Sequence, residues 1–485
     1  MSPFDKARYG ELLKGLEISE VRLSEIDLGD RFDAEYFSKQ DLAIATMLKK
    51  RGSDELRAFG EFVASAFYPA ATELYSVGDV PFIRCVDCIS YPVVTHRQDN
   101  LFERIPSAFV VNNKGVSSLN RGEIVITKVG SPCYASIVHE HDSVALSRTV
   151  MGIAKIHGID PYYLLAFLRS KYGFLQLMRQ RELTIQYQLT LERVKRVLVF
   201  KPSIEFQARI RELVYQFIDC ERKAATQYLE SEKALLSELS FSGWAPTTQS
   251  VSVKKYSDFI SAGRFDAEYF QPKYDELFAL LDKCTTRPLG GNTGLVDIQR
   301  SIEPGSDAYA DKGVPFVRIA DFTEMGITPP EIHISPDICA DSPRPRKDTI
   351  LLSKDGSVGI AYKVEDDLDV VTSSGILHLT VKDEAVLPDY LTLVLNSKIV
   401  RLQAERDAGG SIIQHWKQSE IERVRIPLLP LPRQRALAAK VQSSFALRAE
   451  SRRLLEKAKT MVETAIEQGE GKVSSLIARK GGDVL

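Results

Sequence analysis

The chain has 485 residues, of which 44% are hydrophobic and 26% are charged. This length exceeds that of an ordinary single domain, so we expect two or three domains. The composition permits a packed core and excludes wholesale disorder. The formal net charge of −2 excludes a general polycation that coats nucleic acid, although a local basic stripe would be enough to contact phosphates.

The six cysteines are scattered and form no dense framework, which favours a reducing compartment. Residues 1–16 lack the apolar core of a signal peptide. No apolar run approaches the roughly 20 residues that a membrane-spanning helix needs. We therefore expect a cytoplasmic protein.

The first half of the chain carries β-rich patterns followed by helical ones. Short runs of Val and Ile with two-residue alternation, punctuated by Gly, Pro and Asn, predict strands. A helical pattern follows at Pro161–Arg181, where proline suits the first turn, and a strand-like run at Val197–Lys201 closes this part. The predicted strands are Val80–Cys85, Ala108–Val111, Glu123–Lys128 and Ser136–His139.

A long helix is predicted next, over about Phe206–Leu239. Its apolar residues recur three and four positions apart, as in the seam of a coiled coil. A second long helix with the same spacing is predicted over about Arg433–Glu467, near the end of the chain. Two such helices in one chain can pair with each other.

The second half has the same order of patterns as the first. A helical pattern at Pro388–Asp407 and a strand-like run at Val424–Leu429 precede its long helix. The predicted strands are Val314–Ile319, Thr349–Ser353, Gly359–Val364 and Gly375–Val381. The predicted segments are 1–20 at the N-terminus, 21–202 and 263–430 for two β-rich domains, 203–240 and 431–468 for the two helices, 241–262 for a linker and 469–485 for a flexible tail.

The two halves also repeat each other in sequence. The heptapeptide Arg31–Phe37 recurs unchanged as Arg264–Phe270. Shorter matches follow in the same order, and Thr127–Ser131 pairs with Ser353–Ser357 at an offset of 226. A period this long indicates two homologous domains and not a solenoid of short repeats. The predicted fold class is therefore α+β, with two homologous β-rich domains separated by two long helices that form an antiparallel coiled coil.

No catalytic residue and no metal site are predicted. The sequence lacks the Asn-Pro-Pro-aromatic motif of amino-methyltransferases, a glycine-rich cofactor loop, Gly-x-Ser-x-Gly and His-Glu-x-x-His. Cys85 and Cys88 have a metal-like spacing, but a structural zinc usually needs four ligands, and the second copy has Ile319 and Phe322 at these positions. We interpret the two cysteines as small buried hydrophobes.

The repeated heptapeptide is interpreted as an element that docks on a scaffold or a partner. Domains that read different DNA sequences should differ where they touch bases and agree where they meet a common scaffold. The identity of the copies therefore argues against base reading. A structural staple would pack the aromatic rings onto the coiled coil and pair Arg with Asp or Glu. The residues concerned are Arg31, Phe32, Asp33, Tyr36, Arg264, Phe265, Asp266 and Tyr269.

Candidate DNA contacts lie in two kinds of loop. Two Lys-x-Gly-Ser turns, 128–131 and 354–357, follow predicted strands; their lysines and exposed amides suit a phosphate, although Gly-Ser is also common in ordinary turns. Residues 169–201 carry a local excess of positive charge around Thr184–Gln188, and 409–417 is the corresponding place in the second half. Amide and aromatic side chains between basic residues suit base-edge reading, with a solvated helix face as the alternative.

Residues Arg344–Lys347 form a further basic cluster. The candidate DNA-binding residues are Lys128, Ser131, Arg179, Arg181, Gln186, Tyr187, Arg346, Lys347, Lys354, Ser357, Gln414, His415, Trp416 and Lys417.

With these features the chain resembles the specificity subunit of Type I restriction–modification systems. The resemblance is carried by the two heptapeptides, the strand-turns Gly122–Lys128 and Asp348–Ser357, and the proline-rich lead Ile426–Gln434 into the last helix. It covers about Val21–Glu467. The first copy departs from the pattern at Phe200–Gln207, where the proline-rich lead is eroded.

The resemblance implies that each repeat is a target recognition domain that reads one half of a split DNA site, with the helices as a spacer. About 33 helical residues span ~50 Å, enough to separate readers on major-groove faces ~34 Å apart. A tandem repeat on antiparallel helices implies pseudo-twofold symmetry and half-sites in opposite orientation with an unread gap. Two methyltransferase subunits, optional restriction subunits that translocate DNA, and double-stranded DNA are the implied partners. No cofactor is expected in this chain; S-adenosylmethionine, Mg and ATP belong to the partners.

Three alternatives remain at the level of the sequence. The chain could be the recognition subunit of a Type IIB-like system, in which one partner combines nuclease and methyltransferase. It could be a protein-interaction scaffold that binds no DNA, or an enzyme whose site has no recognisable motif. Steep salt dependence of duplex binding would separate a DNA reader from a scaffold.

Overall fold

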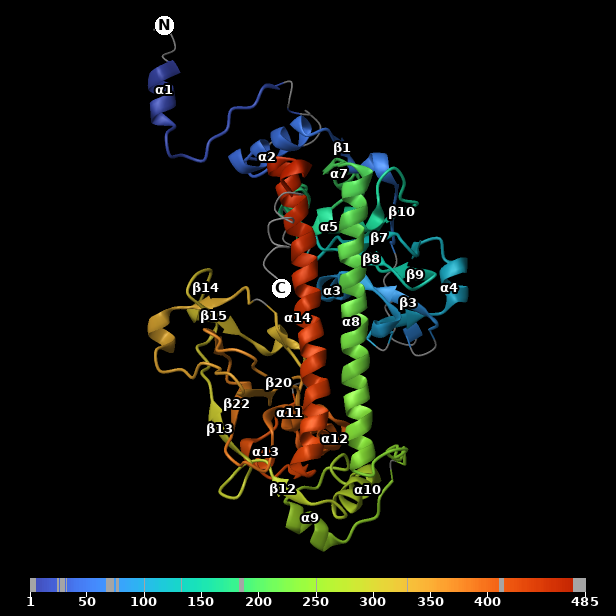
Figure 1. The fold of residues 1–485 in the computed structure, drawn as a ribbon, viewed down its shortest axis with the longest axis vertical. Helices are drawn as coiled ribbons and strands as arrows, with labels where there is room; N and C mark the ends of the chain where they lie inside the picture. Colours follow the sequence, from blue (N-terminus) through green and yellow to red (C-terminus); the bar gives the residue numbers. More distant parts are fainter. Residues whose placement is uncertain are drawn as a thin grey trace. The chain divides into compact units, whose positions relative to one another are not determined.

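The computed structural model describes residues 6–473 apart from 24–25, 27–30, 32, 67–73, 76–77, 100, 132, 183–186, 250, 329 and 410–413. The chain forms two compact units. Unit 1 combines Met1–Arg222 with Ala449–Leu485, and unit 2 is Lys223–Arg448. Both long helices, α8 (Ile204–Glu238) and α14 (Leu431–Gln468), are divided between the units. The α+β class is confirmed (Figure 1).

Among the described residues, unit 1 holds three sheets, with strand orders β2-β10-β7-β8-β4, β5-β3-β9-β6 and β1-β11. Its elements before α8 are α1 (Lys6–Leu12), α2 (Lys39–Lys50), β1 (Ser53–Glu55), η2 (Leu56–Phe59), β2 (Glu61–Ala64), β3 (Val80–Ile83), α3 (Cys85–Ser90), β4 (Val93–Val94), η4 (His96–Gln98), β5 (Glu103–Ile105), α4 (Ser107–Asn112), β6 (Ser118–Asn120), β7 (Ile124–Thr127), β8 (Ala135–Val138), β9 (Ser143–Leu146), β10 (Val150–Ala154), α5 (Pro161–Arg169), α6 (Lys171–Arg179), α7 (Leu191–Val194) and β11 (Leu198–Phe200).

Unit 2 holds sheets with strand orders β13-β22-β19-β20, β14-β18-β15-β21, β12-β23 and β16-β17. Its elements between α8 and α14 are α9 (Tyr256–Ala262), α10 (Pro272–Leu281), β12 (Thr286–Pro288), β13 (Val296–Arg300), η5 (Ser306–Ala308), β14 (Tyr309–Ala310), β15 (Val314–Val317), η6 (Ile319–Asp321), β16 (Phe322–Thr323), β17 (Gly326–Ile327), β18 (His333–Ile334), η7 (Pro336–Cys339), β19 (Ile350–Ser353), β20 (Ala361–Lys363), β21 (Val371–Thr372), β22 (Ile376–Val381), α11 (Pro388–Asn396), α12 (Lys398–Asp407), α13 (Gln418–Ile421) and β23 (Arg425–Pro427).

The two units have matching strand orders. Antiparallel neighbours β10-β7-β8 in unit 1 correspond to β22-β19-β20 in unit 2, and the parallel pair β3-β9 corresponds to β15-β21. Hydrogen bonds repeat as well. The hydroxyl of Tyr163 donates to the carbonyl of Phe200 at 2.7 Å, and that of Tyr390 donates to Pro427 at 2.8 Å. The repeated tyrosine therefore ties a buried helix to the closing strand in each unit.

Two sequence predictions need correction. The run Ala108–Val111 is helical, within α4, because an apolar run of four residues does not distinguish helix from strand and the carbonyl of Pro106 accepts the N–H groups of Phe109 and Val110. Each predicted helical segment after the sheets is a pair of helices. Ser170 separates α5 from α6, and Ser397 separates α11 from α12; both serines have extended backbone.

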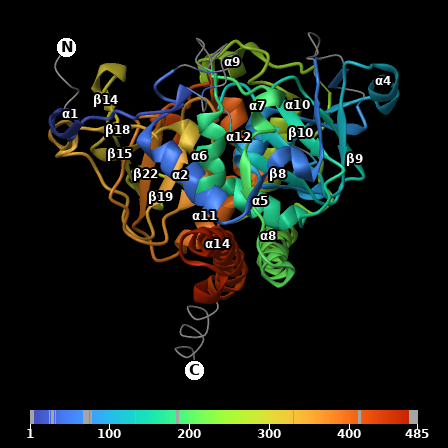
Figure 2. The ribbon, with the colours of Figure 1, turned by 90° about the horizontal axis from the view of Figure 1, so that it is seen from above.

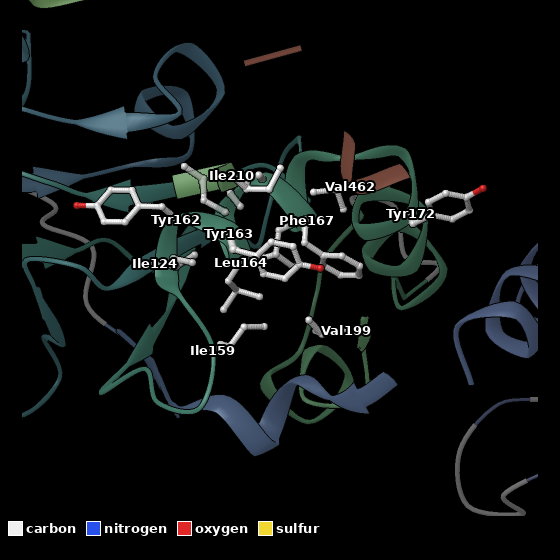
Figure 3. Close-up of a cluster of buried hydrophobic side chains, with 14 of the residues drawn as sticks. Ile124, Ile159, Tyr162, Tyr163, Leu164, Phe167, Tyr172, Val199, Ile210 and Val462 are labelled. Carbon is white, nitrogen blue, oxygen red and sulfur yellow. The ribbon is translucent and has the colours of Figure 1, made fainter. Parts of the chain in front are cut away.

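The core of unit 1 lies around α5, which is apolar over almost its whole circumference (Figure 3). Tyr163, Leu164 and Phe167 are fully buried and pack with sheet residues such as Ile124. Side chains of both long helices complete the same core. Those from α8 are Phe206, Ile210, Val214, Phe217 and Ile218, and those from α14 are Leu454, Ala458, Met461, Val462, Ala465 and Ile466.

Within each unit α8 and α14 contact each other and run in opposite directions (Figures 1 and 2). In unit 1, the N–H of Ser203, just before α8, donates to Glu470 at 3.0 Å, and the hydroxyl of Ser451 donates to Glu221 at 2.5 Å. In unit 2, the hydroxyl of Ser444 donates to the carbonyl of Ala224 at 2.7 Å. Among the residues described, no helix is both long and apolar enough to cross a membrane.

The core of unit 2 contains a buried titratable group, His378 on β22. Its Nε2 lies 2.8 Å from the hydroxyl of Thr372, and burial lowers the pKa of His378 from 6.5 to about 4. Between pH 6.5 and 4 the unfolded chain binds a proton that the folded chain does not, so the free energy of unfolding should fall as pH falls, by up to about 3 kcal/mol. Chemical denaturation of unit 2, followed by fluorescence of its tryptophans, measures this.

In the same experiment His378→Gln should flatten the pH dependence over this range. His157→Gln, at an exposed histidine of unit 1, should leave it unchanged. An unaltered slope in His378→Gln would contradict the assignment.

Candidate nucleic-acid interface

Two of the loops singled out in the sequence meet in unit 1. The turn after β7 contains Lys128 and Ser131, and its Gly130 has a φ of 90°, which favours glycine. The N–H of Leu189 donates to the carbonyl of Lys128 at 2.9 Å, and Val129 forms a β-bridge with Gln188. The turn and the segment that ends the predicted 184–188 loop thus form one surface, which we name loop pair 1 (128–131 with 187–189).

The same two loops meet in unit 2. The turn after β19 contains Lys354 and Ser357, with Gly356 at a φ of 64°. The N–H of Trp416 donates to the carbonyl of Lys354 at 2.8 Å, and Asp355 forms a β-bridge with His415. This surface, loop pair 2 (354–357 with 414–417), uses the same backbone arrangement with different side chains.

The two loop pairs differ in charge. In loop pair 2, Asp355 forms an ion pair with Lys354, and its other oxygen lies 2.7 Å from Nδ1 of His415. In loop pair 1, the residue after Lys128 is Val129, and no described carboxylate lies within ion-pair distance of Lys128. Lys128 is therefore a less neutralised cation than Lys354.

Several predicted contacts are exposed on these surfaces. Tyr187 is 41% exposed, and the guanidinium of Arg181 lies 4.2 Å from its ring centroid, an amphipathic pair able to stack on a base. Ser131, Ser357, Gln414, His415 and Lys417 are also exposed. Gln186 lies outside the described residues.

Trp416 is placed differently from the prediction. It is 1% exposed and belongs to the hydrophobic core of unit 2, so its ring supports loop pair 2 from inside instead of presenting a face to a base. The basic cluster is also separate. Arg346 and Lys347 precede β19 while Lys354 follows it, so they lie at opposite ends of that strand, and Arg346 pairs with Asp367 at 3.0 Å.

The first heptapeptide binds the end of α6 in its own unit. Arg31 is buried, forms an ion pair with Asp33 and donates to the carbonyl of Arg181 at 2.5 Å. Arg179 donates to the carbonyl of Tyr36 at 2.9 Å, with its guanidinium 4.1 Å from the Tyr36 ring centroid. The hydrogen bond from Arg31 holds the pKa of Asp33 below its usual value. Phe32 lies outside the described residues.

The second heptapeptide repeats this arrangement at the end of α12. Arg264 pairs with Asp266 and donates to the carbonyl of Asp407 at 2.7 Å, and the guanidinium of Arg406 lies 4.8 Å from the ring centroid of Tyr269. Phe265 is 67% exposed. We name these the heptapeptide clamps (31–36 on α6, 264–269 on α12). The expected Arg–Asp pairing is present. The tyrosine rings contact arginines of α6 and α12, and Phe265 stacks on Phe259 of α9, whereas packing of the rings onto the long helices was expected.

One polar cluster in unit 1 was not predicted from the sequence. His96, Asp99 and His141 bring their ligand atoms within 4.8 Å of one another, although His141 is 42 positions beyond Asp99 in the chain. No motif joins residues so far apart; only the pairing of β4 with β8 does. The cysteines match their interpretation in part: Cys88 is fully buried, with its pKa raised to about 12 by burial, while Cys85 is half-buried.

The contacts of the first heptapeptide clamp predict that Arg31 stabilises α6. Replacing Arg31 with Ala leaves Asp33 and the carbonyl of Arg181 without their charged partner, so the local stability of α6 should fall by about 1–3 kcal/mol. Glu35→Ala, at an exposed position of the same heptapeptide, should change it by less than about 0.5 kcal/mol. Hydrogen exchange of the peptide covering α6 measures both; equal protection in the two variants would contradict the clamp.

Comparison with known proteins also indicates a DNA-recognition domain. Residues 292–456 match the family model described as the Type I restriction modification DNA specificity domain. No curated protein matches the chain. This match covers most of the second β-rich half and about two thirds of α14.

Two solved structures are also similar. The S subunit of a Type I restriction–modification system from M. genitalium is 12% identical, over 85% of this chain and 94% of its own, with a TM-score of 0.38. The HsdS subunit from Thermoanaerobacter tengcongensis is 18% identical, over 72% of this chain and 82% of its own, with a TM-score of 0.27. The match of residues 292–456 to the Type I restriction modification DNA specificity domain agrees with the resemblance inferred from the sequence.

Proposed function

We propose that this chain is the DNA sequence-recognition subunit of a Type I restriction–modification complex. In this role it reads a bipartite target and directs adenine methylation and restriction by partner subunits. The match of residues 292–456 to the DNA specificity domain is the observation that carries the proposal. Because this family model describes recognition and not chemistry, the chain itself is proposed to be non-catalytic.

The loop pairs are the proposed reading surfaces. Lys128, Ser131, Arg181 and Tyr187 would contact DNA from unit 1, and Lys354, Ser357, Gln414, His415 and Lys417 from unit 2. Lysines and serines suit phosphates, whereas the amide and aromatic side chains suit base edges and stacking. The backbone of the two surfaces is alike and the side chains differ, which is what two readers of unlike half-sites require.

Arg346 and Lys347 keep a proposed role as a separate phosphate contact, since both are exposed. Arg179 is better explained as part of the heptapeptide clamp, because its guanidinium already holds Tyr36.

We further propose that α8 and α14 form an antiparallel coiled coil that separates two homologous recognition domains related by pseudo-twofold symmetry. The matching strand orders of the units and the opposite direction of the helices within each unit support this. Half-sites in opposite orientation, with an unread gap between them, follow from such symmetry. The proposed partners are double-stranded DNA, two methyltransferase subunits and restriction subunits; S-adenosylmethionine, Mg and ATP would be bound by the partners.

The difference in charge between the loop pairs gives a prediction about salt. Lys128→Gln should weaken binding to all duplexes and reduce the negative slope of log affinity against log salt by about one, the loss of one phosphate contact. Asp355→Asn should strengthen binding, because it frees Lys354 and His415 from a carboxylate. Fluorescence anisotropy of the assembled complex over a salt series measures both.

The control for this experiment is Lys155→Gln, since Lys155 pairs with Glu61 away from the loop pairs. It should leave the slope unchanged. Binding that hardly depends on salt, in the unmodified protein, would favour the protein-interaction scaffold over a DNA reader.

The function as a whole is tested by mapping methylated adenines in a host with and without this chain and its partner genes. A bipartite methylated sequence should appear only with the chain. Deleting seven facing residues from α8 and from α14 keeps the seam in phase and removes ~10 Å of helix, so the unread gap should shorten by about three base pairs while both half-sequences persist. Altered half-sequences would contradict the spacer, and methylation independent of the chain would contradict the function.

A further inference from the structure

We propose that His96, Asp99 and His141 of unit 1 bind one divalent transition-metal ion, with zinc as the best fit to the ligands. Two imidazoles and one carboxylate are a ligand set that zinc accepts, and water would complete the coordination. The site is structural in role and lies apart from the loop pairs. It stands independently of the proposed function.

The topology of unit 1 brings the three residues together. Strands β4 and β8 are parallel neighbours, with Val93 opposite Ile137 and Val94 opposite Val138. Parallel strands end at the same edge of a sheet, so the chain leaving β4 and the chain leaving β8 emerge side by side. His96 begins η4, one residue after the end of β4, Asp99 follows η4, and His141 lies in the turn between β8 and β9.

The distances approach those of a metal site. Nε2 of His141 lies 3.1 Å from one oxygen of Asp99, and Nδ1 of His96 lies 3.2 Å from the other. All three ligand atoms fit within 4.8 Å. Ligands at about 2.0–2.1 Å from a tetrahedral zinc are ~3.3 Å from one another, which is close to both histidine–aspartate distances.

The contact between His141 and Asp99 leaves two buried polar atoms that a metal ion could bind. His141 is 5% exposed, and neither its Nε2 nor the facing Asp99 oxygen has a hydrogen-bond partner. An ion placed between these two buried atoms would give each of them a bond that it lacks in the present arrangement.

Two charged neighbours shape the site. Arg104 approaches the same Asp99 oxygen at 3.4 Å and competes with a metal for it, so the ion must use the side of the carboxylate that faces the two rings. The carboxylate of Glu140 accepts the N–H of His96 at 2.8 Å, which fixes the backbone of the first ligand. The ring of His96 is 60% exposed, so an ion and its water can reach the site from solvent.

The metal would secure the contact of this loop with α8. Arg97, between the ligands His96 and Asp99, donates to the carbonyl of Glu221 at 2.9 Å and to its carboxylate at 2.7 Å, all within unit 1. At the offset of 226 that aligns β8 with β20, unit 2 has Asp367 in place of His141, and Asp367 is paired with Arg346. We therefore expect one metal ion per chain.

The test uses the full chain purified without added metal, then equilibrated with zinc and freed of excess ion. Metal content by mass spectrometry should be about one zinc per chain, and cobalt should give a visible d–d spectrum. The variants His141→Ala and Asp99→Asn should lower zinc affinity at least about tenfold, and zinc should raise the Tm of the unmodified chain but not theirs. His157→Ala, at an exposed histidine elsewhere in unit 1, should behave like the unmodified chain.

Other outcomes would overturn the proposal. An unmodified chain that neither retains zinc nor gains stability from it carries no site here. Zinc that is lost from Cys85→Ser or Cys88→Ser, but retained by both ligand variants, belongs to the thiols. Asp99→Asn preserves the size of the side chain, so a folded Asp99→Asn protein, checked by circular dichroism, decides the question even if His141→Ala fails to fold.

Discussion

The core of unit 1 depends on side chains from opposite ends of the chain. Residues of α14 such as Leu454 and Val462 pack against α5 and α8, which lie more than two hundred positions earlier. A helix that is apolar on almost every side, like α5, needs cover all round, and the sheet alone covers one face of it. Unit 1 therefore becomes complete only when the end of the chain has returned to it, which makes α14 part of the core as well as a spacer in the proposed function.

Contacts between residues far apart in the chain also limited what could be predicted from the sequence. Long helices, most strands and the duplication were visible because periodicity and repetition are local or collinear signals. The breaks at Ser170 and Ser397 were missed, since a single extended residue leaves the apolar pattern on both sides intact. The cluster of His96, Asp99 and His141 was missed for a different reason: strand pairing creates it, and pairing is not written in any one segment.

Comparing the two units separates structural residues from variable ones. The heptapeptide clamps are identical in sequence and nearly identical in contacts, with Arg31 and Arg264 each joining an aspartate to a carbonyl at or just beyond the end of a helix. The loop pairs share backbone hydrogen bonds but not side chains, as Val129 and Asp355 show. The two units therefore have identical residues in the heptapeptide clamps, which stabilise each unit, and different residues in the loop pairs. That distribution fits two readers of different half-sites on one kind of frame.

The excess of positive residues in 169–201 predicted a more basic surface than the structure has. Much of that charge is used inside unit 1. Arg169 donates to the carbonyls of Ala135 and Cys88, and Arg193 pairs with Glu182. Arg179 and Arg181 face aromatic rings. Arg169, Arg179 and Arg193 would lose these partners on turning to a phosphate, so we expect each of them to contribute little to the proposed DNA binding. In the proposed function, the attraction of DNA to unit 1 would then depend on few cations. Lys128, which has no described carboxylate within ion-pair distance, would matter more than a run of arginines.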